Sequence, residues 1–322
     1  NAALLRRRIR DPKFSMELYG VGRRSRSDVV ICYISDSVDK SVLKRMRKLI
    51  QSIDVDALTM NIESLAECMF THKWINPFPK FKYSERPDTA TAAILDGNIV
   101  IMVDNSPAVM IIPASIFDII EEADDFNFSP IIGSYLRITR FFFSIVTWIL
   151  TPLWLLFVNN PDWVPEFLKF ILITDDITVP VLLQLLILEL AVDGLKLAAV
   201  NTPTMLSTPL SIVAGIVVGE YAVSSGWFNP EALLYMAVVT VGTYGQTNFE
   251  MGYAFKFLRV LMLILTQIFN LAGFITGVVI SVLMIAFNRT ITGKSYIYPL
   301  IPWDGKMLKR KVFRVRLPHG YK

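Results

Sequence analysis

The chain has 322 residues, a formal net charge of +4 and a mean hydropathy of +0.47, and 53% of its residues are hydrophobic against 19% that are charged. Its two cysteines, Cys32 and Cys68, exclude a disulfide framework and lack the spacing of a metal site. The charges are concentrated in residues 1–135, whereas apolar runs of nearly membrane-spanning length occupy 141–287. We therefore predict an integral membrane protein with a soluble N-terminal domain.

Both ends of the chain are basic, from LLRRRIR near the start to the cluster of Lys and Arg in 306–322. No nucleic-acid-binding fold or interleaved aromatic pattern accompanies these runs, so we expect no nucleic-acid partner. Basic flanks usually stay in the cytoplasm, where anionic lipid headgroups are the expected partner. The chain starts at Asn1 without an initiator Met, which suggests that an upstream portion precedes it.

Residues 1–135 are expected to form a cytoplasmic α+β domain with a mixed sheet. The stretches that are rich in β-branched residues predict strands, and those with apolar residues at helical spacing predict helices. Asn61 is the expected N-cap of one helix, and Asp96-Gly97-Asn98 is the expected turn before a strand. The predicted elements in chain order are the strand 27–35, the helix 38–53, the strand 56–60, the helix 61–70, the strand 99–103, and an apolar strand and an acidic helix after a turn at 105–107.

The soluble domain shows no set of catalytic residues. Asp88, Asp96 and Asp104 are candidates for acid–base or metal chemistry, but Asp96 and Asp104 stand in turns, where carboxylates commonly bond their own backbone. The sequence contains no phosphate-binding Gly-rich loop, no nucleophile elbow and no histidine cluster. We expect no enzymatic activity, no metal and no cofactor.

Residues 136–290 are expected to form an all-α polytopic membrane domain, followed by a basic cytoplasmic tail at 291–322. The loop 159–176, with four acids against one Lys, and the loop 221–231, which has no cation, indicate the outer side, and loops with Lys and Arg indicate the inner side. Two inside termini require an even number of crossings, so the long stretch 255–287 should turn at NLAG (270–273), giving six segments, or re-enter as a buried hairpin. The other candidate segments are 139–158, 177–200, 204–224 and 230–245.

Three charged residues fall on one helical face inside the segment 177–200. Glu189, Asp193 and Lys196 follow the spacing i, i+4 and i+7, so they face the same neighbour. Charges are costly at membrane depth, and pairing of the carboxylates with Lys196 is the expected solution. The stripe is either an ion-pair cluster that fixes helix packing or a polar lining for ions or gating.

Pro203 and Pro209 predict a helix break ahead of a segment with two distinct faces. Gly215 and Gly219 form a GxxxG face that is suited to close packing on another helix. The opposite face is either exposed to lipid or, if copies of the chain surround an axis, the wall of a pore with an acidic mouth. The residues of this opposite face are Leu206, Leu210, Val213, Val217 and Glu220.

Several long motifs run nearly end to end through the chain. The longest are LDGNIVIMVDNSPAVMIIPAS (95–115), LELAVDGLKLAAVNTPTMLSTPLS (188–211) and NPEALLYMAVVTVGTYGQTNFEMGYAFKFLR (229–259). These motifs resemble those of the GerA family of bacterial spore germination proteins. Within that family, FNRTITGKSYIYPLIPWDGK (287–306) and the short RLPH tail most resemble the SpoVAF branch.

The resemblance implies a multi-pass protein of the spore inner membrane, with both termini on the core side. It implies a homopentameric ion channel that releases monovalent cations during germination, together with a small partner membrane protein. Two alternatives remain: the A subunit of a nutrient germinant receptor, which works with B and C subunits, and a secondary transporter with a broken-helix site. The sequence shows no internal repeat that would favour a transporter.

Overall fold

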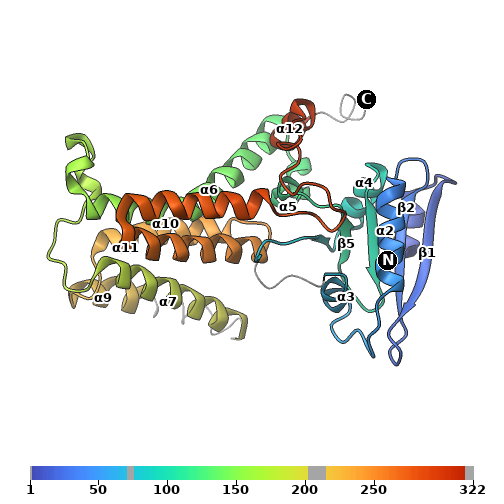
Figure 1. Cartoon of the computed structure of the whole chain (residues 1–322), viewed down its shortest axis with the longest axis horizontal. Helices are drawn as coiled ribbons and strands as arrows, with labels where there is room; N and C mark the ends of the chain where they lie inside the picture. The colour runs from blue at the N-terminus through green and yellow to red at the C-terminus, as the bar shows by residue number, and fades with distance from the viewer. Residues whose placement is uncertain (1, 71–75, 202–214, 316–322) are drawn as a thin grey trace. The chain divides into compact units, whose positions relative to one another are not determined.

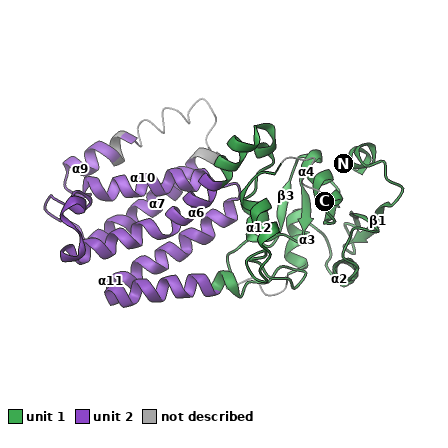
Figure 2. Cartoon of the chain, turned by 90° about the horizontal axis from the view of Figure 1, so that it is seen from above, with its two compact units in different colours: residues 1–137, 284–322 green, residues 138–283 purple. Residues whose placement is uncertain are grey.

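The computed structural model describes residues 2–70, 76–201 and 215–315, apart from the side chains of 199–201 and 216–218. The chain divides into two compact units, which Figure 2 colours separately. Unit 1 combines residues 1–137 with 284–322, and unit 2 comprises 138–283. The expected tail at 291–322 therefore belongs to the same unit as the N-terminal residues.

Unit 1 is built on a five-stranded sheet with the strand order β1-β2-β4-β5-β3 (Figure 1). Every pairing in this sheet is antiparallel, so the mixed sheet expected from the sequence is wrong. Short connections account for two of these pairings, because β1 and β2, and likewise β4 and β5, are joined by five residues, whereas parallel neighbours need a crossover of a dozen or more residues. The strands are β1 (Phe14–Val21), β2 (Ser27–Ile34), β3 (Lys82–Ser84), β4 (Ile99–Val103) and β5 (Val109–Ile112).

The sheet is buried on both faces, because successive side chains of its central strands enter two different apolar clusters. Ile31 of β2 packs with α2 (Lys40–Gln51) and α3 (Ile62–Cys68), whereas its neighbour Cys32 packs with α1 (Ala2–Arg8) and α4 (Pro87–Leu95). This alternation follows from the two-residue period of a strand. Unit 1 is therefore a three-layer α+β fold, completed by α5 (Ile116–Ile120), η1 (Ala123–Asn127) and α12 (Gly305–Val312).

Local sequence signals located several elements correctly and missed others. The strand expected at 27–35, the strand at 99–103 and the helix at 38–53 are present as β2, β4 and α2. The strand expected at 56–60 is absent, because these described residues form bends and turns. Asn61 is the N-cap residue of α3, as expected, but it has a φ of 47° and its side chain makes no cap hydrogen bond.

All regular secondary structure in the described residues of unit 2 is helical. Trp154, Leu185, Met236 and Leu263 bring four helices into one apolar core. Among the described residues, α6 and α11 are the two helices long and apolar enough to cross a membrane; the six crossings stay a prediction. Its elements are α6 (Pro130–Asn159, which begins in unit 1), η2 (Pro161–Trp163), η3 (Glu166–Ile171), α7 (Val181–Asn201), the π-helical η4 (Ile216–Tyr221), α9 (Ala222–Ser224), α10 (Pro230–Tyr244) and α11 (Phe249–Ala286).

The long apolar stretch of α11 reverses direction within the predicted NLAG sequence. Asn270 has φ 52° and ψ −130°, which breaks the helix into two arms. A Cβ on Gly273 would collide with the carbonyl of Leu265, and one on Gly277 would lie 3.3 Å from the Cα of Met262, so the two arms run against each other. The expected turn is confirmed at this position. Asn270 and Asn160 exchange side-chain hydrogen bonds of 2.6 and 2.9 Å at the tip.

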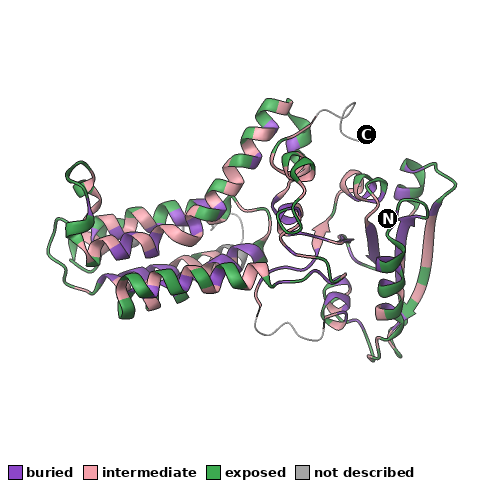
Figure 3. Cartoon of the chain, turned by 45° about the horizontal axis from the view of Figure 1, so that its top comes forward, coloured by how far each residue is buried: buried purple, intermediate pink, exposed green. Residues whose placement is uncertain are grey.

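Large apolar side chains remain exposed along the helices of unit 2, where Figure 3 shows exposed positions over their whole length. Phe142 is 59% exposed and Phe269 is 61% exposed. Exposed apolar area on this scale is costly in water and is expected where lipid or another subunit covers a helix.

Candidate functional site

The acidic residues of α7 lie in an ion-pair cluster with cations of α11. Glu189 is 4% exposed, and its Oε1 accepts a hydrogen bond of 2.5 Å from the Nε of Arg259. Lys256 pairs with Asp193 and also lies 3.4 Å from Oε2 of Glu189. Arg259 additionally donates to the carbonyl of Thr147 on α6. The cluster therefore ties three helices of unit 2 together.

Lys196 takes a different place from the one expected. Its Nζ lies over the rings of Tyr244 and Tyr253, at 5.2 and 5.5 Å from the centroids. The expectation that Lys196 neutralises the two acids is wrong, because Lys256 and Arg259 supply the pairing charges. The sequence carries a signal for them, since these two cations stand three residues apart in an otherwise apolar stretch.

A small cavity of about 80 Å³ adjoins this cluster. Two of its acceptor atoms, Oδ1 of Asp193 and Oε1 of Gln246, are buried and have no hydrogen-bond partner among the described residues. A polar cavity of this size has room for a few waters at about 10–15 Å³ each, and water is able to donate to both acceptors. The charged lining comprises two acids, Glu189 and Asp193, and three cations, Lys196, Lys256 and Arg259. This excess of positive charge opposes passage of a cation and favours the structural interpretation of the stripe.

The predicted pore segment is described only from residue 215 onward. Leu206, Leu210, Val213, Pro203 and Pro209 lie outside the described residues, as does the side chain of Val217. Glu220 is exposed, and Gly215 and Gly219 are exposed with open space where a Cβ would stand. Residues 216–221 are π-helical. A face defined by α-helical spacing shifts within such a stretch, so the shared face of Val217 and Glu220 stays a prediction.

Unit 1 contains a second buried charge cluster that the sequence did not reveal. Nζ of Lys311 lies 2.5 Å from Oδ1 of Asp118 and 3.1 Å from Oε2 of Glu121. Burial lowers the pKa of Lys311, but the two carboxylates outweigh it and hold this pKa above its usual value. Arg137, 2% exposed, donates to Glu121 at 2.6 Å and to Asp125 at 3.1 Å. Lys82 donates to the carbonyls of Asp118 and Glu121 at 2.7 Å each.

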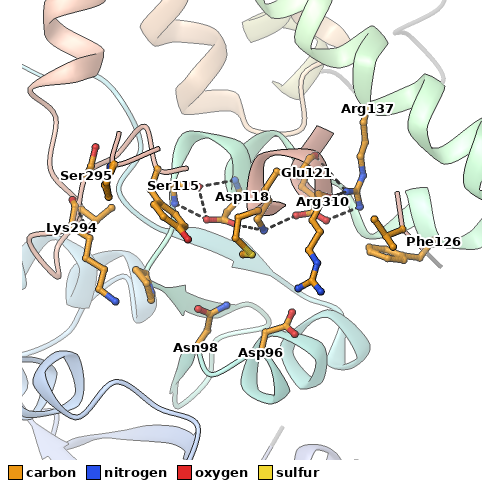
Figure 4. A pocket seen from close by; sticks show the side chains of 17 residues that line it. Asp96, Asn98, Ser115, Asp118, Glu121, Phe126, Arg137, Lys294, Ser295 and Arg310 are labelled. Carbon is orange, nitrogen blue, oxygen red and sulfur yellow. Dashed lines mark hydrogen bonds and ion pairs between the residues drawn. The ribbon is translucent and has the colours of Figure 1, made fainter. Parts of the chain in front are cut away.

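This second cluster borders a cavity of about 760 Å³ in unit 1. Figure 4 shows Ser115, Asp118 and Glu121 on one side of the cavity and Asp96 and Asn98 on the other. Burial raises the pKa of Asp96. The volume is within the range of small-molecule pockets, but the lining mixes acids and bases and does not select one class of ligand.

Two of the three carboxylates considered for catalysis, Asp88 and Asp104, take part in local structure. Asp104 accepts a hydrogen bond of 3.0 Å from the backbone N–H of Asn105, as expected of a turn. Asp88 accepts one of 2.8 Å from the N–H of Thr89 and pairs with Arg86. Across the part of the chain that the structure describes, no group of three His, Cys, Asp or Glu side chains is placed to hold a metal ion.

Comparison with known proteins gives a match along the entire chain. The model of the family described as Bacillus/Clostridium GerA spore germination protein matches residues 1–322. The chain is 37% identical over 318 residues to stage V sporulation protein AF of Bacillus subtilis (strain 168), which covers 99% of this chain. It is 28% identical over 320 residues to spore germination protein GerLA of Bacillus cereus, which covers 98% of this chain.

The chain spans 64% of the length of each of these two relatives. Among solved structures, it is similar to the N-terminal domain of the A subunit of the Bacillus megaterium spore germinant receptor GerK3, with 33% identity. That match covers 34% of this chain and 86% of the solved chain, with a TM-score of 0.27.

Proposed function

The chain belongs to the GerA family of spore germination proteins, and from this premise we propose that it is a subunit of an ion channel in the spore inner membrane. In this proposal, five copies surround a pore that conducts monovalent cations during germination and amplifies ion release. Both termini lie on the core side, and a small membrane protein is the partner. The similarity to stage V sporulation protein AF supports this branch of the family.

The observation that carries the channel proposal is the exposure of the segment that begins at residue 215. Gly215 and Gly219 leave room for close approach of a second helix. Glu220 stands exposed on the same short segment. An acidic ring formed by symmetry-related copies attracts cations to a pore mouth. The acids of α7, by contrast, are paired within one subunit and are not available to a permeating ion.

Reconstitution of the purified oligomer tests this function. We expect liposomes that contain the protein to release K⁺ or Na⁺, and we expect planar bilayer recordings to show discrete conductance steps. Particle images along the membrane normal should show a ring of five subunits. A monomer by mass with no conductance would contradict the proposal.

One alternative is the A subunit of a nutrient germinant receptor. It is supported by the similarity to GerLA and by 26% identity over 320 residues to spore germination protein KA of Bacillus subtilis (strain 168). A receptor subunit is expected to purify with B and C subunits from spores, whereas the proposed channel is expected to purify with a small membrane protein.

A secondary transporter is the other alternative, and the helix break at Asn270 favours it, since transporters place such breaks near their substrate sites. Saturable counterflow without conductance steps would distinguish a transporter from a channel.

A further inference from the structure

The segment that follows α11 carries an exposed apolar tip beside exposed cations. Leu300, Ile301 and Trp303 are 41%, 59% and 72% exposed. Lys306 and Lys309, one turn apart on α12, are also exposed. Within its bounds, α12 contains four cations and no acid. We refer to these five exposed residues as the tail surface.

The side of this segment that faces away from the tail surface is attached to the start of α6 and to the residues just before it. Lys311 is committed to Asp118 and Glu121. The backbone N–H of Arg314 donates to Oγ of Ser134 at 3.0 Å, and the guanidinium of Arg137 donates to the carbonyl of Arg310 at 3.1 Å. The lysines of the tail surface therefore belong to a helix that is held in place rather than to a free tail.

The contact with Arg137 determines where along α6 this helix is held. Arg137 precedes the apolar run 141–158 by four residues. Four residues of an α-helix extend about 6 Å along its axis. If α6 crosses the membrane, as the proposed function requires, this point of α6 enters the bilayer at the headgroup layer, and α12 is attached there.

We propose that the tail surface binds the anionic headgroup layer of the membrane that α6 enters, with Ile301 and Trp303 inserted at the interface and Lys306 and Lys309 on lipid phosphates. Trp favours the boundary between headgroups and acyl chains, and Lys near an anionic surface adds electrostatic attraction. The two lysines make this surface electrostatically complementary to anionic lipid. The inference rests on the membrane location within the proposed function, but it requires neither conductance nor a pentamer.

A fluorescent probe at position 301 tests this contact in the full chain. Cys68→Ser leaves Cys32, which is 0% exposed and whose pKa burial raises to about 12, so a maleimide labels only an introduced cysteine. We expect a probe on Ile301→Cys to shift to the blue in nanodiscs with about one-third phosphatidylglycerol, and brominated lipid to quench it. The matched probe on Leu18→Cys, at a site 65% exposed on β1, should stay in water.

The charge contribution is tested by the double variant Lys306→Gln/Lys309→Gln. Each lysine near an anionic surface strengthens binding about fivefold. The blue-shifted fraction of the probe at position 301 should therefore fall markedly in nanodiscs that contain phosphatidylglycerol. The matched control is Lys40→Gln/Lys44→Gln, which removes two exposed lysines from α2 and should leave the signal unchanged. Equal docking in pure phosphatidylcholine, or no effect of the tail lysines, overturns the inference.

A third probe separates this inference from the proposed function. Phe142 lies in the apolar run and is 59% exposed. A probe on Phe142→Cys should be quenched by brominated lipid in every lipid composition. If position 142 is quenched and position 301 is not, the inference about the tail surface is overturned and the membrane location stands. If position 142 stays in water, the membrane location falls and the inference falls with it. A blue shift at 301 in nanodiscs that brominated lipid does not quench would indicate a protein occupant and also overturn it.

Discussion

Glu189 illustrates why helical spacing alone did not identify an ion-pair partner. Spacing showed that Glu189, Asp193 and Lys196 share one face, and this face does meet a neighbouring helix. The partners, Lys256 and Arg259, lie more than sixty residues further along the chain, and nothing in α7 specifies which helix packs against it. Lys196 instead finds two tyrosine rings.

This arrangement predicts that Arg259→Ala is far more destabilising than Lys196→Ala. Removing Arg259 leaves the buried carboxylate of Glu189 without its closest cation, which costs about 3–5 kcal/mol. Removing Lys196 costs only the attraction to the rings, about 0.5–2 kcal/mol. Melting temperatures of the two variants in detergent measure the difference. Equal losses would restore Lys196 as the main partner of the acids.

Glu17 predicts a pH-dependent contribution to the stability of unit 1. Its carboxylate accepts hydrogen bonds from Arg47 at 2.9 Å and from Tyr33 and Tyr19, which lowers its pKa from 4.5 to about 2. The unfolded chain therefore takes up the proton first as the pH falls. The stabilisation is fully present above pH 4.5 and disappears as the pH falls toward 2.

The variant Glu17→Gln should accordingly be less stable than the parent at pH 7 and nearly equal to it near pH 2. Hydrogen exchange of β1 and β2 across this pH range measures the difference. Asp54→Asn is the matched control, because Asp54 and Arg23 are both 68% exposed and such a pair contributes little. A difference between Glu17→Gln and the parent that does not change with pH would contradict the role of ionisation.

Among the elements, the strands and helices with strong patterns were predictable, and those with weak or ambiguous patterns were not. The run VVICYI in β2 is rich in β-branched residues and was located correctly. Helix α4 was not among the predicted elements, and Pro87 occupies its first turn, where proline is well tolerated. The pairing of strands was also not predictable, because neighbours in the sheet are selected by tertiary packing.

The hairpin of α11 predicts a strong requirement for glycine at 273. A methyl group there would collide with the carbonyl of Leu265, so Gly273→Ala should force the arms apart and cost about 1–3 kcal/mol. Gly194→Ala on α7 is the matched control, since open space surrounds that position and alanine favours a helix by about 0.5–1 kcal/mol. The expected result is a lower melting temperature for Gly273→Ala alone. Similar melting temperatures for both variants would argue against close arms.

At the scale of the whole molecule, the proposed pore predicts opposite effects for two kinds of substitution. Polar residues at Leu210 or Val213 should wet an apolar constriction and produce a leak of monovalent cations. Glu220→Gln should reduce cation preference by removing negative potential at the mouth. Planar bilayer recordings of the oligomer measure both effects.

The control for these substitutions is a polar residue at Leu234, which is 60% exposed on α10. It should leave the conductance unchanged. If polar substitutions on α10 or α11 open the channel and those at 210 and 213 do not, a different helix lines the pore.

Unit 1 is assembled from both ends of the chain, and this constrains when it can fold during synthesis. Ile291 is 3% exposed in the core against the sheet, and Tyr296 accepts a hydrogen bond of 2.9 Å from the N–H of Ile116 through its carbonyl. These residues leave the ribosome only after 138–283 have been made. If the proposed membrane location holds, the apolar helices of a nascent chain therefore reach the insertion machinery while the sheet of unit 1 still lacks part of its core, and that core can close only after residues 138–283 have been synthesised.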